Sequence, residues 1–124
     1  MVQSAAQPSP TIVIVASDAG LRRALRFLLQ AEGHAVESLD SAEALIGLDP
    51  GRADCLIVDQ DLSGMTGLEA LGRLEPRRRT PTVLLASEAD GSLREAARRT
   101  GVELVGKPFH GAQLLAAVRV ALGG

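Results

Sequence analysis

The residues best suited to chemistry stand where an apolar run stops on an acid. Residues 55–58 read Cys-Leu-Ile-Val, and Asp59 follows directly, before a loop that contains Gly64 and Gly67. Such a run predicts a strand buried on both faces, as in parallel sheets covered by helices. Asp59 would then end its strand at the edge where open parallel sheets bind ligands, beside glycines that permit tight turns. We therefore predict a reactive carboxylate at Asp59, rather than an acid that merely ends a strand.

Lys107 is the second candidate, because it is the only lysine among thirteen basic residues. It stands in the sequence Gly-Lys-Pro-Phe at 106–109, at the expected exit of the last strand. Its compact ammonium fits beside a single anionic oxygen, where the planar fork of arginine would be awkward. Chance is the alternative explanation, since a lone lysine must stand somewhere. We predict that Lys107 faces Asp59 across a crevice.

Five strand-like segments alternate with helical patterns along the chain. The expected strands are residues 11–16, 34–39, 55–59, 82–86 and 102–105. The expected helices run from a cap at 17–18 to Glu32, over 42–48, from 68 to Pro76, from Asp90 or Ser92 to Arg99, and over 113–122. This alternation predicts one α/β domain with a doubly wound parallel sheet and right-handed crossovers.

The composition of the strands predicts their order in the sheet. The first, third and fourth are apolar throughout, whereas the second contains His34, Glu37 and Ser38 and the fifth contains Glu103, as edge strands do. The expected order is 2-1-3-4-5, the flavodoxin-like arrangement. Its switch point lies between strands one and three, which would bring residues 17–18 close to Asp59.

Size and composition limit the remaining function classes. The chain has 124 residues, of which 46% are hydrophobic, enough for one core. A net charge of −2 gives no electrostatic footprint for nucleic acid. The single cysteine, Cys55, excludes an internal disulfide, and its apolar surroundings favour packing over reactivity. No apolar stretch reaches the roughly 20 residues of a membrane span, so we expect a cytoplasmic protein without membrane contact.

The ends of the chain are expected to lie outside the domain. Residues 1–10 are rich in proline, serine and glutamine and predict a flexible leader, residues 11–122 form the domain, and residues 123–124 begin a linker or end the chain. Three consecutive arginines at 77–79 are interpreted as solvated surface rather than as a patch for an acidic partner.

Two motifs resemble those of a known family, and the resemblance as a whole covers residues 11–122. The order of Asp59, Leu62, Met65, Thr66 and Gly67 resembles the phosphoacceptor loop of response-regulator receiver domains, and the sequence at 106–109 matches the Lys-Pro-Phe of that family. The resemblance implies that a histidine kinase or phosphotransfer protein phosphorylates the Asp, that the lysine contacts the phosphoryl group, and that the Lys-Pro bond is commonly cis. Such a domain is not an enzyme but switches an output domain or partner protein.

The resemblance also implies Mg²⁺ at the phosphorylation site, but the ligand set here departs from the family pattern. Receiver domains usually place two adjacent acids at the end of the first strand, where this chain has Ala16 and Ser17. Asp18 follows one residue later, but the favoured interpretation of this residue is the N-cap of a helix. The Asp59 carboxylate and the backbone carbonyl of Asp61 would remain the main ligands, with Asp18 as a further candidate. We expect weak Mg²⁺ binding.

Three further positions differ from the family. The threonine or serine that ends the fourth strand is Ala86 here, and Ser87 next to it is a candidate substitute. The aromatic residue of the last strand is Leu104, and the proline of the phosphoacceptor loop is Ser63. The last strand and last helix are the expected surface for a partner or a homodimer, and a leucine at 104 would favour one fixed arrangement.

Two alternatives to a working receiver remain open. The first is a pseudo-receiver, in which the fold serves as a dimerisation or docking module independent of phosphate. The second is a phosphatase of the haloacid-dehalogenase type, because Asp59-Gln60-Asp61 resembles the Asp-x-Asp loop of those enzymes. That loop normally follows the first strand of the chain, which speaks against it here.

Overall fold

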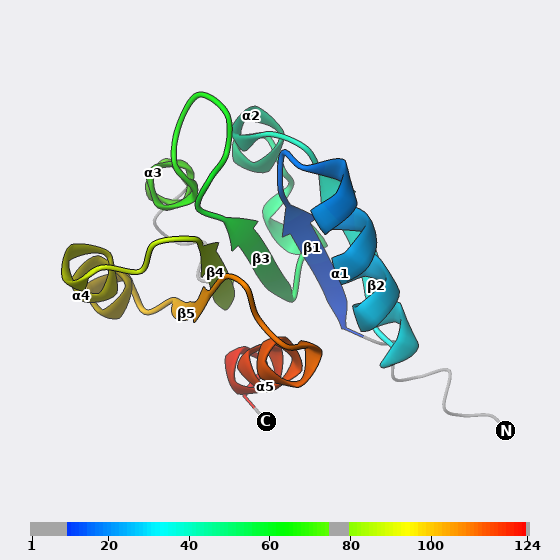
Figure 1. The fold of residues 1–124 in the computed structure, drawn as a ribbon. Helices are drawn as coiled ribbons and strands as arrows, with labels where there is room; N and C mark the ends of the chain where they lie inside the picture. Colours follow the sequence, from blue (N-terminus) through cyan, green and yellow to red (C-terminus); the bar gives the residue numbers. More distant parts are fainter. Residues whose placement is uncertain (1–9, 75–79, 124) are drawn as a thin grey trace, which may run out of the picture.

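The apolar runs form a five-stranded parallel sheet in the computed structural model, which describes residues 10–74 and 80–123 (Figure 1). The strands are β1 (Thr11–Val15), β2 (Ala35–Leu39), β3 (Cys55–Asp59), β4 (Thr82–Ala86) and β5 (Glu103–Gly106). The helices are α1 (Ala19–Ala31), α2 (Ala42–Ile46), α3 (Gly67–Gly72), α4 (Gly91–Thr100) and α5 (Gly111–Ala121). A short 3-10 helix, η2 (Pro50–Arg52), precedes β3.

The strand order is β2-β1-β3-β4-β5, and every neighbouring pair is parallel. This confirms the predicted doubly wound sheet with the order 2-1-3-4-5. The strands with polar residues lie at the two edges, because their exposed faces need not be desolvated. The carboxyl ends of β1 and β3 are therefore neighbours, with Val15 opposite Val58 in the register.

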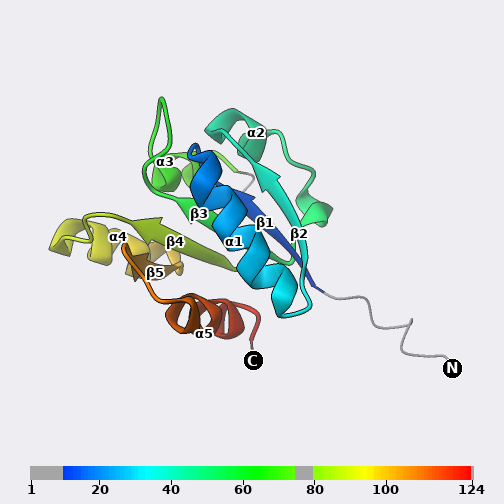
Figure 2. The same cartoon turned by 45° about the vertical axis from the view of Figure 1, so that its right-hand side comes forward.

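Each face of the sheet has its own hydrophobic core. Side chains alternate between the faces along a strand, so Ile12 and Ile14 of β1 lie in one cluster with α1 and α5, while Val13 and Val15 lie in the other with α2 and α3. Figure 2 shows α1 and α5 together on one side of the sheet. All five residues of β3 are buried, which confirms the prediction of a strand covered on both faces.

Several predicted boundaries are wrong by one to four residues. The second strand begins at Ala35 rather than at residue 34, and β5 covers 103–106 rather than 102–105. The second helix ends at Ile46, because Gly47 caps it, and α5 begins two residues earlier than predicted, at Gly111. The third helix ends at Gly72 and not at Pro76. Asp90, and not Ser92, caps α4.

Some predictions concern residues outside the described ranges. These are most of the expected leader (1–9), Pro76, the arginines at 77–79, and residue 124. Within the described residues, the helices are all too short or too polar to cross a membrane.

Gly67 is the point where α3 comes closest to the end of β3. A Cβ atom at this position would lie 2.5 Å from the Asp59 carbonyl oxygen and 2.9 Å from Cγ1 of Val58. The Gly67 N–H also donates a hydrogen bond to the Gln60 carbonyl, at 3.0 Å. The glycine therefore lets the helix pack directly against the backbone of Asp59.

We expect Gly67→Ala to lower the free energy of unfolding by about 2 kcal/mol, because the added methyl group overlaps backbone that cannot move aside cheaply. Gly72→Ala in the same helix is the matched control, since nothing lies within 4 Å of its added Cβ. Alanine favours the helix by up to about 1 kcal/mol relative to glycine, so the control should be neutral or stabilising. Urea denaturation measures both, and equal effects would contradict the close packing.

Candidate functional site

Asp59 is a buried carboxylate at the C-terminal end of β3. The residue is 3% exposed, and no other charged residue in the described ranges is classed as buried. Its position follows from the sheet, because the apolar residues before it fix β3 between β1 and β4. A carboxylate in such a place requires a partner for its charge.

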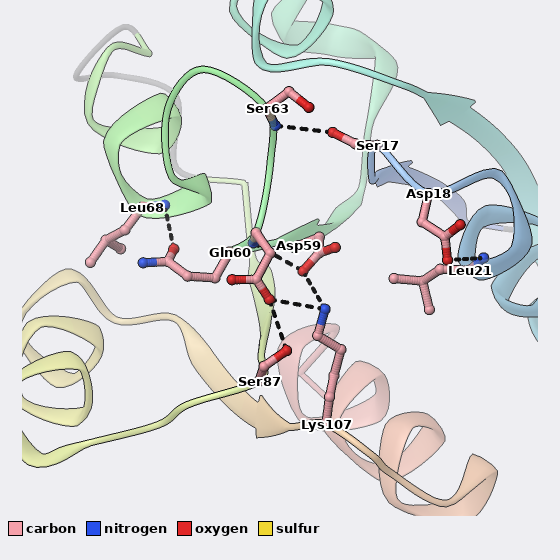
Figure 3. A network of polar contacts seen from close by, with 10 residues as sticks. Ser17, Asp18, Leu21, Asp59, Gln60, Ser63, Leu68, Ser87 and Lys107 are labelled. Carbon is pink, nitrogen blue, oxygen red and sulfur yellow. Dashed lines mark hydrogen bonds and ion pairs between the residues drawn. The ribbon is translucent and has the colours of Figure 1, made fainter.

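Lys107 supplies that partner from the end of β5. Its Nζ lies 2.9 Å from Asp59 Oδ1 and 3.1 Å from Asp61 Oδ2, so one ammonium bridges two carboxylates (Figure 3). The structure thus joins Asp59 and Lys107, as the sequence predicts. The Lys107–Pro108 peptide bond is cis, in agreement with the family resemblance.

Ser87 and the backbone of Asp61 complete the network. The Ser87 hydroxyl donates to Asp61 Oδ2 at 2.9 Å, and the Asp61 N–H donates to Asp59 Oδ1 at 3.1 Å. The Asp61 side chain is 54% exposed, so it lies at the mouth of the site while Asp59 lies inside. The loops after β3, β4 and β5 therefore meet at this cluster (Figure 3).

The cluster shifts the pKa values of its members. Burial opposes the charge on Lys107, but the hydrogen bonds to Asp59 and Asp61 outweigh it and raise the pKa of Lys107. Burial likewise opposes the charge on Asp61, but its contacts with Lys107 and Ser87 lower its pKa. Both shifts favour the charged forms, as expected for groups with opposite charges within hydrogen-bonding distance.

Asp18 lies at the start of α1 and caps it. Its carboxylate accepts hydrogen bonds from the backbone N–H groups of Gly20 and Leu21, and Figure 3 shows it beside Leu21 rather than in the network around Asp59. The structure does not bring its side chain into contact with Asp59 or Lys107. No cluster of three or more histidine, cysteine or acidic side chains suited to a metal occurs among residues 10–74 and 80–123.

Ser17 connects the loop after β1 to the loop after β3. Its hydroxyl accepts a hydrogen bond from the Ser63 N–H at 3.1 Å (Figure 3). Nearby, the Arg22 guanidinium donates to the carbonyls of Ala16 and Ser17, at 2.7 and 3.0 Å. Sequence reasoning missed both contacts. One signal was available for the first, since a serine in place of proline restores an N–H at position 63.

The comparisons with known proteins agree with this geometry. A protein-family model described as the response regulator receiver domain matches residues 12–119. The chain belongs to this family. Asp59 and Lys107, the two residues that carry the family resemblance, are in contact at the carboxyl edge of its parallel sheet.

Two similar proteins are named as transcriptional regulatory proteins. The receiver domain is 36% identical over 118 residues to the phosphate regulon transcriptional regulatory protein PhoB of Rhizobium meliloti (91% of this chain, 52% of PhoB). It is 30% identical over 114 residues to the transcriptional regulatory protein FixJ of Bradyrhizobium diazoefficiens (90% of this chain, 56% of FixJ). The chain therefore spans about half the length of these relatives.

Solved structures show the same fold. The receiver domain of HemR from Leptospira biflexa, in its non-phosphorylated form, superposes with a TM-score of 0.84 at 23% identity, covering 94% of this chain and 96% of that one. The response regulator StyR gives a TM-score of 0.83 at 31% identity over 93% of this chain and 60% of its own.

The receiver domain departs from its family where β4 ends. Ala86 is 1% exposed and has no hydroxyl, and the hydroxyl of Ser87 reaches Asp61 rather than Asp59. Ser87 thus lies in the site, but it contacts Asp61 and not the candidate phosphoacceptor Asp59. Leu104, in place of the family's aromatic residue, is partly buried and packs against the core on the α2 and α3 side of the sheet.

We expect Lys107→Met to lower the free energy of unfolding by about 2 kcal/mol at pH 7, because it leaves Asp59 buried without its cation. Breaking a fully buried pair costs about 3–5 kcal/mol, and access of water to the Lys107 side chain reduces this. Arg23→Met, on the exposed face of α1, is the control and should change stability by less than about 0.5 kcal/mol.

The pH dependence of this loss follows from the raised pKa of Lys107. The stabilisation is fully present below the ordinary value of 10.5 and is lost as the pH rises through the higher folded value. The difference between wild type and Lys107→Met should therefore shrink above about pH 10.5. The chain has no tyrosine and no other lysine, so few other groups titrate there. An unchanged difference in urea denaturation from pH 7 to 11 would contradict the assignment.

Proposed function

We propose that this receiver domain accepts a phosphoryl group on Asp59 from the phosphohistidine of a histidine kinase or phosphotransfer protein. The observation that carries the proposal is the contact between Asp59 and Lys107 at the carboxyl edge of the sheet. The phosphorylated state switches an output domain or partner protein. By the names of its relatives that output is transcription, although a net charge of −2 gives this domain itself no electrostatic footprint for nucleic acid. A cytoplasmic location is part of the proposal.

The transfer uses an oxygen of Asp59 as the nucleophile. Oδ1 is engaged by Lys107 and by the Asp61 N–H, whereas Oδ2 has no hydrogen-bond partner among the described residues. As the Oδ2–P bond forms, the P–N bond to the donor imidazole breaks, and the imidazole keeps the electron pair and takes a proton from water. Lys107 remains beside the phosphoryl oxygens and offsets their charge, while the Ser87 hydroxyl is the available donor at the end of β4.

Mg²⁺ fits this site as a weakly held ion. It favours oxygen ligands and commonly binds through one or two carboxylates together with waters and phosphate. The Asp59 carboxylate and the backbone carbonyl of Asp61 would hold it, and when bound it neutralises charge on the phosphoryl oxygens. Asp18 would join the ligands only by giving up its hydrogen bonds to the start of α1.

A pseudo-receiver is the second candidate, and the absence of acids at positions 16 and 17 favours it. The domain would then act as a docking or homodimerisation module through β5 and α5. The phosphatase hypothesis gains no support from the fold, because the Asp59 loop follows β3 rather than the first strand.

Incubation with acetyl phosphate and Mg²⁺ should add the mass of one phosphoryl group to the wild-type protein, measured by intact mass spectrometry. The acyl phosphate forms as acetate leaves. Asp59→Asn should take up none, because no other acid combines burial at the strand end with contact to Lys107. Labelling that persists in Asp59→Asn would refute the assignment and implicate Asp18 or Asp61. Wild-type protein that stays unlabelled would favour the pseudo-receiver.

Ser17→Asp should strengthen Mg²⁺ binding by restoring a carboxylate at the position that the family uses. Without metal, the added charge near Asp59 should destabilise the protein, because two close carboxylates repel each other. With Mg²⁺ at about 100 times its dissociation constant, binding adds roughly 2.7 kcal/mol. Thermal melts over a Mg²⁺ titration compare wild type, Ser17→Asp and the uncharged control Ser17→Asn. If wild type gains as much from Mg²⁺ as Ser17→Asp does, another group already serves as the ligand.

A further inference from the structure

The side chain of Asp61 makes contacts that acceptance of a phosphoryl group by Asp59 does not require. Its Oδ2 receives both the Lys107 ammonium, at 3.1 Å, and the Ser87 hydroxyl, at 2.9 Å. These are the two groups to which the proposed function assigns contact with the phosphoryl oxygens. In the unphosphorylated protein, an anion that belongs to the chain itself therefore holds them.

We propose that the Asp61 carboxylate is a built-in competitor that holds Lys107 and Ser87 until a phosphoryl group on Asp59 displaces it. This inference rests on the proposed function and concerns the regulation of the same site. Asp61 is thus a positioning residue, because it acts on the phosphoryl group through Lys107 and Ser87.

The competition follows first from the number of protons available. A serine hydroxyl has one proton and donates one hydrogen bond at a time. Ser87 cannot donate to Asp61 and to a phosphoryl oxygen together, so phosphorylation must break the Ser87–Asp61 bond before Ser87 can contribute. With Ala86 at the end of β4, Ser87 is the hydroxyl that the structure places here.

Charge adds to the competition. Asp59, Asp61 and Lys107 together have a formal charge of −1, from two carboxylates and one ammonium. Transfer of a phosphoryl group replaces the Asp59 carboxylate with an acyl phosphate of charge near −2 at neutral pH, which makes the cluster about −2. The Asp61 carboxylate then repels the new group and contends with it for the ammonium. Because the Asp61 side chain is half exposed, it can turn into water when displaced.

The same bond connects two loops. Asp61 belongs to the loop between β3 and α3, and Ser87 belongs to the loop between β4 and α4. Displacement of Asp61 therefore releases the β4–α4 loop from the β3–α3 loop. Phosphorylation would in this way alter the position of the loop that leads into α4. No aromatic residue at position 104 is needed for this, and the chain has Leu104 there.

Beryllofluoride with millimolar Mg²⁺ tests the competition as a phosphoryl mimic, with binding measured by calorimetry. Asp61→Asn keeps the shape and the backbone carbonyl but removes the charge, so it should bind the mimic about tenfold more tightly than wild type. Glu88→Gln is the matched control, since it removes an exposed charge next to Ser87 that makes none of these contacts. Its effect should stay below about threefold.

A double-mutant comparison distinguishes two effects of Asp61→Asn. One is release of the Ser87 hydroxyl, and the other is loss of charge repulsion between Asp61 and the mimic. In a Ser87→Ala background, the gain from Asp61→Asn should fall to about threefold or less, because no hydroxyl remains to be released. Urea denaturation of the same four proteins without the mimic should show that the two substitutions are non-additive, since they break one bond. That measurement tests the contact itself, whether or not the mimic binds.

The outcomes distinguish the two proposals. Unchanged or weaker binding by Asp61→Asn, with wild type binding normally, overturns the competition and leaves the phosphoacceptor intact. An equal gain with and without Ser87 also overturns it, in favour of simple repulsion. If neither wild type nor any variant binds the mimic or takes up phosphate, both proposals fail as functional statements. Binding by Asp61→Asn alone would support the competition most strongly.

Discussion

One ammonium group between two carboxylates joins the loops at the carboxyl edge of the sheet. Lys107 draws Asp59 from the end of β3 and Asp61 from the following loop to within about 3 Å of itself. The contact is feasible because parallel strands place all their carboxyl ends at the same edge. A buried carboxylate without a cation would be costly, and the Lys107 ammonium offsets that cost for Asp59.

The sheet makes this arrangement rigid. The strands β1, β3 and β4 are covered on both faces, by α1 and α5 on one side and by α2, α3 and α4 on the other (Figures 1 and 2). Their ends therefore cannot shift without disturbing two cores. Gly67 extends this rigidity to α3, which packs directly on the backbone of Asp59. The candidate phosphoacceptor Asp59 is therefore packed against both the sheet and α3.

The departures from the family pattern are consistent with one another. Two additional carboxylates at positions 16 and 17 would take the formal charge of the cluster from −1 to −3, a repulsion that metal would have to offset. Here the Ser17 hydroxyl instead accepts a hydrogen bond from the N–H of Ser63. Ser63 also differs from the family, which has a proline there, so two of the changed positions contact each other. Arg22 further binds the carbonyls of Ala16 and Ser17. Where the family has acids, this chain thus has a hydrogen bond that connects the loops after β1 and β3.

The sequence by itself determined the fold, the strand order and the contact at the centre of the candidate site. Apolar runs such as 55–58 and the more polar strand at 35–39 encode burial, and burial determines which strands are central. Asp59 and Lys107 could be paired in advance because both end strands of one parallel sheet. Only the tertiary structure decided which partners the side chains of the loops contact. The sharing of Lys107 with Asp61, the turn of Ser87 toward Asp61 and the contact of Ser17 with Ser63 join residues up to 46 positions apart. Loop side chains have several rotamers of similar energy, and partners from other loops select among them, so these contacts do not follow from local sequence.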